Sequence, residues 1–192
     1  MMRWSLYLGA GLGWIYGGSQ VTTNRPLALL YFCCGLLSWT FMEYAVHRWF
    51  LHRHNMIASG SDPLRCWHRA HHATPEAPHR LPLPLPFSLT GYAMCLIVAW
   101  SWSQTWPLAG LAATGWSLGY LAYEWLHRMY HLGTPQHRIS RALRRHHLIH
   151  HYAEPERAFG ITTPFWDLFF WTWPRHRAPL TLATEQKKWL RR

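Results

Sequence analysis

The chain has 192 residues, enough for one domain, and only 14% of them are charged, against ~25% in typical soluble proteins. Its 14 tryptophans and long apolar runs are typical of a protein that meets a membrane–water interface. The net charge is +11, but no nucleic-acid-binding module is recognisable and most arginines flank apolar segments, so the charge favours a membrane surface over a nucleic acid.

Four apolar stretches are candidates for membrane-spanning helices, which need ~20 apolar residues. In chain order they cover about residues 4–18, 26–46, 87–106 and 107–126. The first is short, so it either crosses with a tilt or lies in the interface. The last two meet at Trp106 and Pro107, which predicts a tight transmembrane hairpin. We therefore expect an all-α integral membrane protein with three to four transmembrane helices.

The hairpin puts residues 47–86 and 127–192 on the same side of the membrane. Both segments are rich in arginine, whereas the hairpin tip carries no charge, so the positive-inside rule predicts that both face the cytoplasm. We expect a single domain over residues 1–192, with these two segments forming a helical, histidine-rich cap, in a bacterial inner membrane. Alternating prolines in residues 80–88 predict an extended connector, and the aromatic residues 165–173 predict a segment in the membrane interface.

Ten of the 15 histidines form two matching sets of five, each starting where an apolar stretch ends. Corresponding members are 80 residues apart for the first pair and 79 apart for the other four. The first set is His47, His52, His68, His71 and His72, and the second set is His127, His131, His147, His150 and His151. Such a register is not expected of scattered histidines and indicates a repeated binding unit.

The spacings within each set favour metal binding. HxxHH and HRMYH place their histidines on one helix face, because residues three and four apart are neighbours there. HRWFLH separates its histidines by five, which predicts a bend or a helix end. Neutral imidazoles gathered in this way are good ligands for iron, zinc, copper or nickel. We predict two metal ions with five histidines each, and either ion can draw on both sets.

Three acidic residues are candidates for supporting these ligands. Glu43 lies four residues before His47 and Glu124 three before His127, and a carboxylate commonly accepts the second N–H of a metal-binding histidine. The alternative for each is a place among lipid headgroups or a pair with an arginine. Asp167 is a further candidate, either as such a partner or as a cap.

Five histidines lie outside the repeat, and we expect most of them in solvated loops. His146 is the exception, because HHLIHH can be aligned from either of its first two histidines, and comparison with HRAHH favours His147. These five are His54, His79, His137, His146 and His176.

HRWFLH followed by HRAHH resembles the histidine boxes of the fatty acid hydroxylase/sterol desaturase superfamily. HRMYHLGTP, HHLIHHY and FGITTPFWD are similar to the second half of the sphingolipid fatty acid 2-hydroxylase pattern, and the resemblance covers residues 40–172. It implies a membrane di-iron monooxygenase that uses O₂ to hydroxylate a long fatty acyl chain, at C2, with the ten histidines as iron ligands. Zinc can replace iron on purification, because imidazole sites bind it more tightly.

The HPGG haem motif of a fused cytochrome b5 domain is absent, so the resemblance implies a separate electron donor of ferredoxin or cytochrome type. Two other function classes remain. One is a different histidine-box oxidoreductase, such as a lipid desaturase or a sterol or carotenoid hydroxylase. The other is a non-enzymatic metal-binding membrane protein, but a transporter usually has ionisable residues at mid-membrane, and these apolar runs are nearly free of them.

Overall fold

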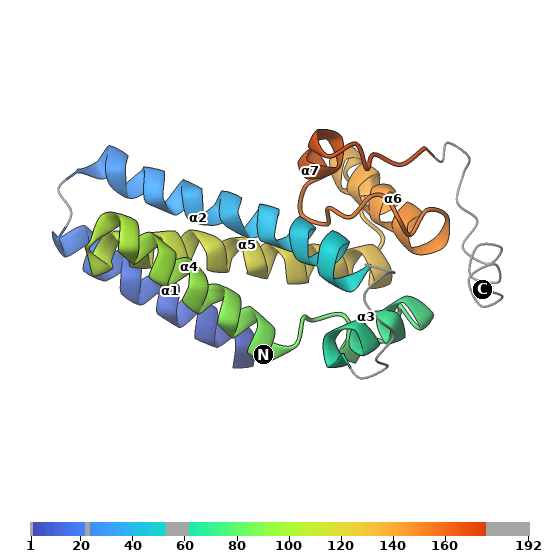
Figure 1. The fold of residues 1–192 in the computed structure, drawn as a ribbon, viewed down its shortest axis with the longest axis horizontal. Coiled ribbons are helices and arrows are strands. Elements are labelled where there is room, and N and C mark those ends of the chain that lie inside the picture. The colour runs from blue at the N-terminus through green and yellow to red at the C-terminus, as the bar shows by residue number, and fades with distance from the viewer. Residues whose placement is uncertain (1, 22–23, 53–61, 176–192) are drawn as a thin grey trace. The chain divides into compact units, whose positions relative to one another are not determined.

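The computed structural model describes residues 2–21, 24–52 and 62–175, and every regular element in these ranges is a helix (Figure 1). The expected positions of His54 and His176 in loops lie outside the described residues. The α-helices are α1 (Met2–Val21), α2 (Arg25–Ala45), α3 (Pro63–Ala73), α4 (Leu85–Ser103), α5 (Trp106–Leu132), α6 (Arg138–Tyr152) and α7 (Phe165–Phe169). A π-helix, η1 (Val46–Leu51), and a 3₁₀-helix, η2 (Pro78–Arg80), complete them.

The chain divides into two compact units. Unit 1 comprises Met1–Phe41 and Leu83–Tyr123, and unit 2 comprises Met42–Pro82 and Glu124–Arg192. Helices α2 and α5 therefore each begin in unit 1 and end in unit 2. All the histidines of the two sets and the three candidate acids belong to unit 2. The single domain over residues 1–192 stays a prediction.

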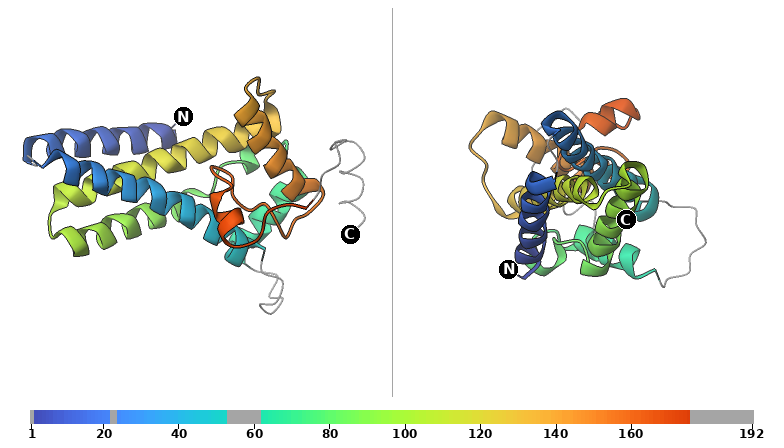
Figure 2. Two further views of the ribbon diagram at one scale, coloured as in Figure 1. Left: turned by 90° about the horizontal axis from the view of Figure 1, so that it is seen from above. Right: turned by 90° about the vertical axis from the view of Figure 1, so that its left-hand side faces the viewer.

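Unit 1 is a set of long helices that lie alongside one another (Figure 2). Helices α2 and α5 approach closely, because a Cβ added at Gly35 would lie 1.8 Å from the Ala112 carbonyl oxygen. Small residues allow such backbone contact between membrane helices. Next to this contact, the rings of Trp39 and Trp116 meet edge to face at 4.9 Å, and each is only 1% exposed. The core of unit 1 is thus aromatic.

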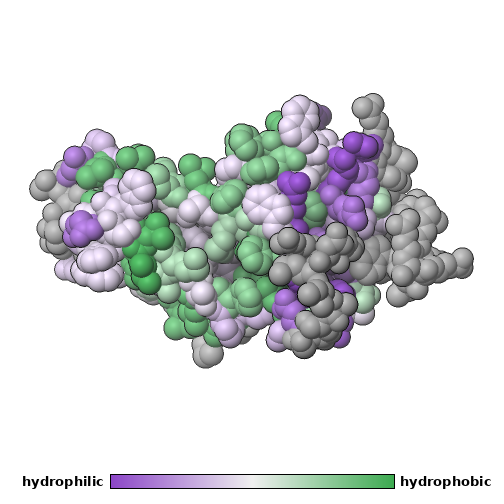
Figure 3. Space-filling view, viewed as in Figure 1, coloured by the Kyte–Doolittle hydropathy of each residue, from purple (hydrophilic) through white to green (hydrophobic). Residues whose placement is uncertain are grey.

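Apolar residues cover much of unit 1 on the side seen in Figure 3, with less apolar residues between them. Leu12, Leu29 and Met94 are each more than 60% exposed. Contiguous apolar surface of this kind marks an interaction site or a membrane-facing region. By length and hydropathy, two of the described segments are able to cross a membrane, Arg25–Leu51 and Pro78–Ser103. The expected number of three to four transmembrane helices stays a prediction.

The predicted hairpin is present as a pair of helices, α4 and α5. Its turn lies at residues 104–105, slightly before the predicted meeting point. Gln104 adopts a left-handed conformation with φ of 54° and donates its backbone N–H to the Trp100 carbonyl at 2.7 Å, which ends α4. Helix α5 then continues beyond the predicted boundary at residue 126 to Leu132, so that it carries His127 and His131.

The proline connector is shorter than predicted. Residues 81–84 are irregular, but α4 begins at Leu85, so the expectation of an extended segment over 80–88 is wrong for its last four residues. Pro86 is tolerated there because it occupies the first turn of α4, where a backbone N–H has no partner within the helix.

Candidate metal centre

The histidines of HRWFLH are aligned by a change of helix type. Helix α2 passes directly into the π-helix η1, in which hydrogen bonds join residues five apart. The backbone N–H of His52 donates to the carbonyl of His47 at 3.2 Å, so the two residues lie one turn apart. The predicted bend or helix end is confirmed, since the helix changes type at Val46 and ends at Leu51, just before His52.

The two HxxHH motifs lie on α3 and α6. Helix α3 starts at a well-formed cap, where the Asp62 carboxylate accepts from the backbone N–H of Leu64 at 3.0 Å. The three histidines of each motif are at most 6% exposed, so their imidazoles face the interior of unit 2. His127 and His131, at the end of α5, are buried as well.

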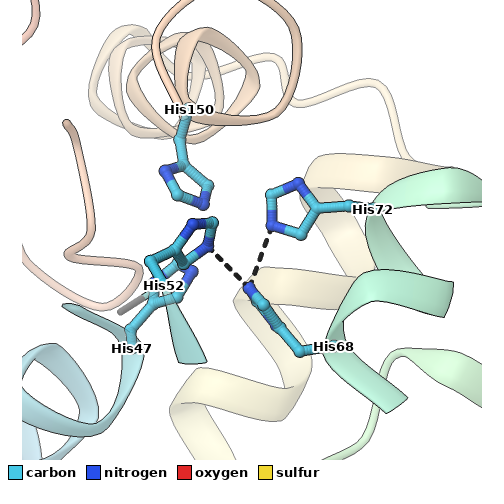
Figure 4. Close-up of side chains that lie close together, drawn as sticks. All are labelled: His47, His52, His68, His72 and His150. Atoms are coloured by element: carbon cyan, nitrogen blue, oxygen red, sulfur yellow. Dashed lines mark hydrogen bonds between the residues drawn. The ribbon is translucent and has the colours of Figure 1, made fainter. Parts of the chain in front are cut away.

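The ten histidines converge in two groups of five. Within each group the candidate ligand nitrogens all lie within 4.8 Å of one another. Two nitrogens bound to one ion at ~2.1 Å are at most ~4.2 Å apart, so only a small contraction is needed to bind an ion. Group 1 is His47, His52, His68, His72 and His150 (Figure 4), and group 2 is His71, His127, His131, His147 and His151.

Each group takes four histidines from one set and the fifth from the other. His150, from the second set, lies in group 1, and His71, from the first set, lies in group 2. These two are corresponding members of the sequence repeat, so the exchange is reciprocal. His72 and His151, which also correspond, stack with ring centroids 4.2 Å apart. The site therefore has an internal two-fold character that interlocks the two halves of the chain.

Backbone carbonyls fix the protonation of two group 1 histidines. His47 donates from Nδ1 to the Phe159 carbonyl at 2.6 Å, and His150 donates from Nδ1 to the Arg157 carbonyl at 2.8 Å. Because a carbonyl only accepts, Nδ1 carries the proton and Nε2 presents a lone pair. Both Nε2 atoms are buried and make no hydrogen bond to any residue that the structure describes. Buried acceptors are rarely left in this state, and a metal ion would satisfy both.

Other histidines point their Nε2 atoms at one another. The Nε2 atoms of His52 and His68 are 2.7 Å apart, and those of His131 and His147 are 2.9 Å apart. In each pair two potential metal ligands therefore face the same small space. Together with the unpartnered nitrogens, this donor set fits a metal ion in each group.

Burial keeps these imidazoles neutral. The pKa values of the six histidines in the two HxxHH motifs lie well below the ordinary 6.5, first because burial disfavours the charged form, and second because neighbouring histidines would repel an added charge. A metal ion therefore has few protons to displace at pH 7. The histidines concerned are His68, His71, His72, His147, His150 and His151.

The candidate acids have specific positions. Glu43 is buried and accepts from the backbone N–H groups of Ile161 and Thr162, the latter at 2.9 Å, and from the Thr162 hydroxyl at 2.6 Å. Asp167 is fully buried and accepts from the backbone of residues 159 and 160. Both thus hold the segment that receives His47. Glu124 is also buried, with 8% of it exposed.

The histidines outside the repeat separate as follows. His79 and His137 are exposed, as expected. His146, which the sequence set apart from the solvated histidines, is buried, and its Nε2 lies 2.9 Å from Asp167 Oδ2. The preference for His147 over His146 agrees with the geometry, because His147 lies in group 2. Sequence patterns did not indicate the carbonyls of Arg157 and Phe159, since any residue type supplies a carbonyl.

Comparisons with known proteins point to one family. The family model described as fatty acid hydroxylase matches residues 32–172. The dihydroceramide fatty acyl 2-hydroxylase FAH1 of Arabidopsis thaliana is 30% identical over 148 residues, covering 76% of this chain and 61% of the relative. The fatty acid 2-hydroxylase of Mus musculus is 34% identical, covering 73% of this chain and 38% of the relative.

A third curated relative, the ceramide very long chain fatty acid hydroxylase SCS7 of Saccharomyces cerevisiae, is 30% identical over 82% of this chain and 41% of its own length. A solved structure described as full-length Scs7p, with only the hydroxylase domain visible, matches with a TM-score of 0.75 and 26% identity over 93% of this chain and 69% of that chain. The chain spans less than two thirds of the length of these curated relatives.

Proposed function

The chain belongs to the fatty acid hydroxylase family, and on that premise we propose that it is a membrane di-iron monooxygenase that hydroxylates a long fatty acyl chain at C2. The observation that carries the proposal is the convergence of ten histidines in two groups of five. The choice of C2 rests on relatives that are named 2-hydroxylases and on the sequence motifs in the second half of the chain.

The proposed metal ligands are the five histidines of each group. When bound, two iron ions would supply the activation of O₂ that amino-acid side chains lack, which zinc, having no redox chemistry, would not provide. The protein's own part is to present neutral imidazoles in fixed orientation. The Nδ1 donors of His47 and His150 are already bonded to carbonyls, so their Nε2 atoms are aimed at the ion position.

The proposed reaction requires an external source of electrons. One oxygen atom enters the C–H bond and the other leaves as water, which consumes two electrons and two protons. We assign the supply to a separate ferredoxin or cytochrome with an acidic surface. Exposed Arg141 and Arg145 lie one turn apart on α6 and are the proposed contact. Activity with such a donor should fall as salt rises, and charge reversal of both arginines should abolish that dependence.

The proposed location is a bacterial inner membrane, as a multi-pass protein with the metal site facing the cytoplasm. Two segments with the length and hydropathy to cross a membrane support it, as do the arginines of residues 47–86 and 127–192. The acyl substrate would then come from the membrane lipid itself.

The deciding experiment is lipid analysis in a host that makes no 2-hydroxy acids. The chain is expressed with an electron donor under isotopically labelled O₂, and hydrolysed lipids are analysed by gas chromatography and mass spectrometry. A labelled 2-hydroxy acid is expected from the wild type and from His79→Ala, whose side chain is exposed outside both groups. His71→Ala should give none. A new double bond, or an altered sterol or carotenoid, would contradict the proposal.

A further inference from the structure

Residues 157–162, here called the strap, accept hydrogen bonds from two histidines of group 1 through their backbone carbonyls. In the described residues, no strap carbonyl is seen to accept from a histidine of group 2. The Arg157 carbonyl accepts from His150 and the Phe159 carbonyl accepts from His47. The two histidines are more than 100 residues apart in sequence. The strap thus orients ligands of group 1 from both halves of the chain.

The N–H of Arg157 closes a turn to the Glu154 carbonyl at 3.0 Å, and beyond it two buried carboxylates accept most of the backbone N–H groups of the strap. Five consecutive backbone N–H groups, from Ala158 to Thr162, are bonded to other parts of unit 2. Asp167 accepts the second and third, each at 2.8 Å, and Glu43 accepts the last two. The first goes to the Thr172 carbonyl at 2.9 Å.

Two backbone positions show how closely the strap is held. Ala158 has a positive φ of 58°, a conformation that L residues adopt at a cost. A Cβ added at Gly160 would lie 2.1 Å from the Thr163 carbonyl oxygen, so the chain can pass here only without a side chain. The surrounding contacts therefore dictate the path of the strap, and the carboxylates supply most of them.

Group 2 is supported differently. His127, which corresponds to His47, donates from Nδ1 to the Leu81 carbonyl at 3.1 Å, outside the strap. His71, which corresponds to His150, has a buried Nδ1 that makes no hydrogen bond within residues 2–21, 24–52 and 62–175. The sequence repeat thus gives both groups the same ligand types, but the two strap carbonyls that accept from histidines serve group 1. On the side of group 2, the Ile161 carbonyl accepts from Tyr130, the neighbour of His131, and not from a ligand itself.

We infer that the strap positions the ligands of group 1 alone, with Glu43 and Asp167 as its positioning residues, so that the two proposed metal ions differ in what holds them. The inference rests on the proposed function, because it presumes a metal ion in each group. Loss of outer partners of metal-binding histidines typically weakens metal affinity ~10–100-fold. Loosening the strap should therefore lower the affinity for the ion of group 1 by such a factor and leave the affinity for the ion of group 2 unchanged.

The two carboxylates should respond differently to conversion into amides. Both backbone donors at Glu43 share Oε1, while Oε2 faces the Thr162 hydroxyl. A glutamine can keep its carbonyl toward the two N–H groups and turn its NH₂ to the hydroxyl. At Asp167 each oxygen accepts a backbone N–H, so an asparagine must point NH₂ at a donor. Hence Glu43→Gln should be mild and Asp167→Asn severe, whereas a role through charge alone would make both equally severe.

The test measures iron per chain after anaerobic loading with Fe²⁺ and competition against graded chelator in detergent. The wild type is expected to hold two ions. Asp167→Asn and Glu43→Ala should hold one ion as the wild type does and the other ~10–100-fold more weakly. Glu43→Gln should resemble the wild type, and so should Glu156→Gln, the same change at an exposed carboxylate next to the strap. Circular dichroism and gel filtration check that each variant folds.

Thr162→Val provides a gentler test if a carboxylate variant fails to fold, because it removes only the hydroxyl donor to Glu43. It should lower the affinity for the same single ion, and by a smaller factor than Glu43→Ala does. Equal weakening of both ions in the folded variants, or no weakening in any of them, would overturn the inference and leave the proposed function intact. A wild-type chain that binds no metal would overturn the proposed function, and the inference with it.

Discussion

The reciprocal exchange of His71 and His150 predicts an unusual pattern of metal loss in paired substitutions. Each group has five histidines, so replacing one removes a direct ligand. Loss of outer partners already costs up to ~100-fold in affinity, so loss of a ligand should cost at least ~100-fold, or ~2.7 kcal/mol. With a chelator that competes with the damaged group but not with the intact group, each single variant should keep one ion.

The paired variants identify which ion is lost. His47→Ala combined with His150→Ala removes two ligands of group 1, so one ion should remain. His127→Ala combined with His150→Ala damages both groups, so none should remain. If each half of the chain instead formed its own site, the two results would be reversed, since His127 and His150 belong to the same set. Elemental analysis of the purified variants gives the answer, and the opposite pattern would refute the exchange.

Three further outcomes are expected. Labelling of cysteines introduced at Glu154 and at Ser59, which lies outside the described residues, should place both positions on the cytoplasmic side and Gln104 on the opposite side. Finding Glu154 and Ser59 on different sides would refute the hairpin topology. Trp39→Ala should lower the free energy of unfolding by ~3–5 kcal/mol, because the ring is 1% exposed. Thermal or denaturant unfolding in detergent measures the change, and a value below ~1 kcal/mol would contradict the packing. In chelator, the metal-free chain should lose stability as pH falls below 6.5, because the buried histidines of the two HxxHH motifs have lowered pKa values and the unfolded state binds more protons there. A melting temperature that does not change between pH 8 and 5 would argue against their burial.

Local rules account for much of what the sequence predicted. Histidines three and four apart share a helix face whatever the rest of the fold does, so the spacing of HRAHH was sufficient to predict one cluster on α3. The apolar runs around Trp106 similarly predicted a helical hairpin. The spacing of five in HRWFLH predicted an irregularity, though not that it would be a π-helix.

The remaining features depend on tertiary structure. The exchange of His71 and His150 follows from how α3 and α6 lie in unit 2, and both partitions of the ten histidines satisfy the same spacings. The strap was not predicted because its acceptors are backbone carbonyls, for which Phe159 offers no sequence signal. Pro86 misled the assignment of the connector, because its place in the first turn of a helix depends on where that helix begins.

Because helices α3 and α6 each supply histidines to both groups, they should control how metal ions enter and leave. Helix α6 provides His150 to group 1 and both His147 and His151 to group 2, while α3 likewise serves both groups. Any excursion that carries α6 away from its place in unit 2 would open the two coordination shells in one event. Both ions should therefore exchange with isotope in solution at a single common rate set by the motion of this helix, even where their equilibrium affinities differ.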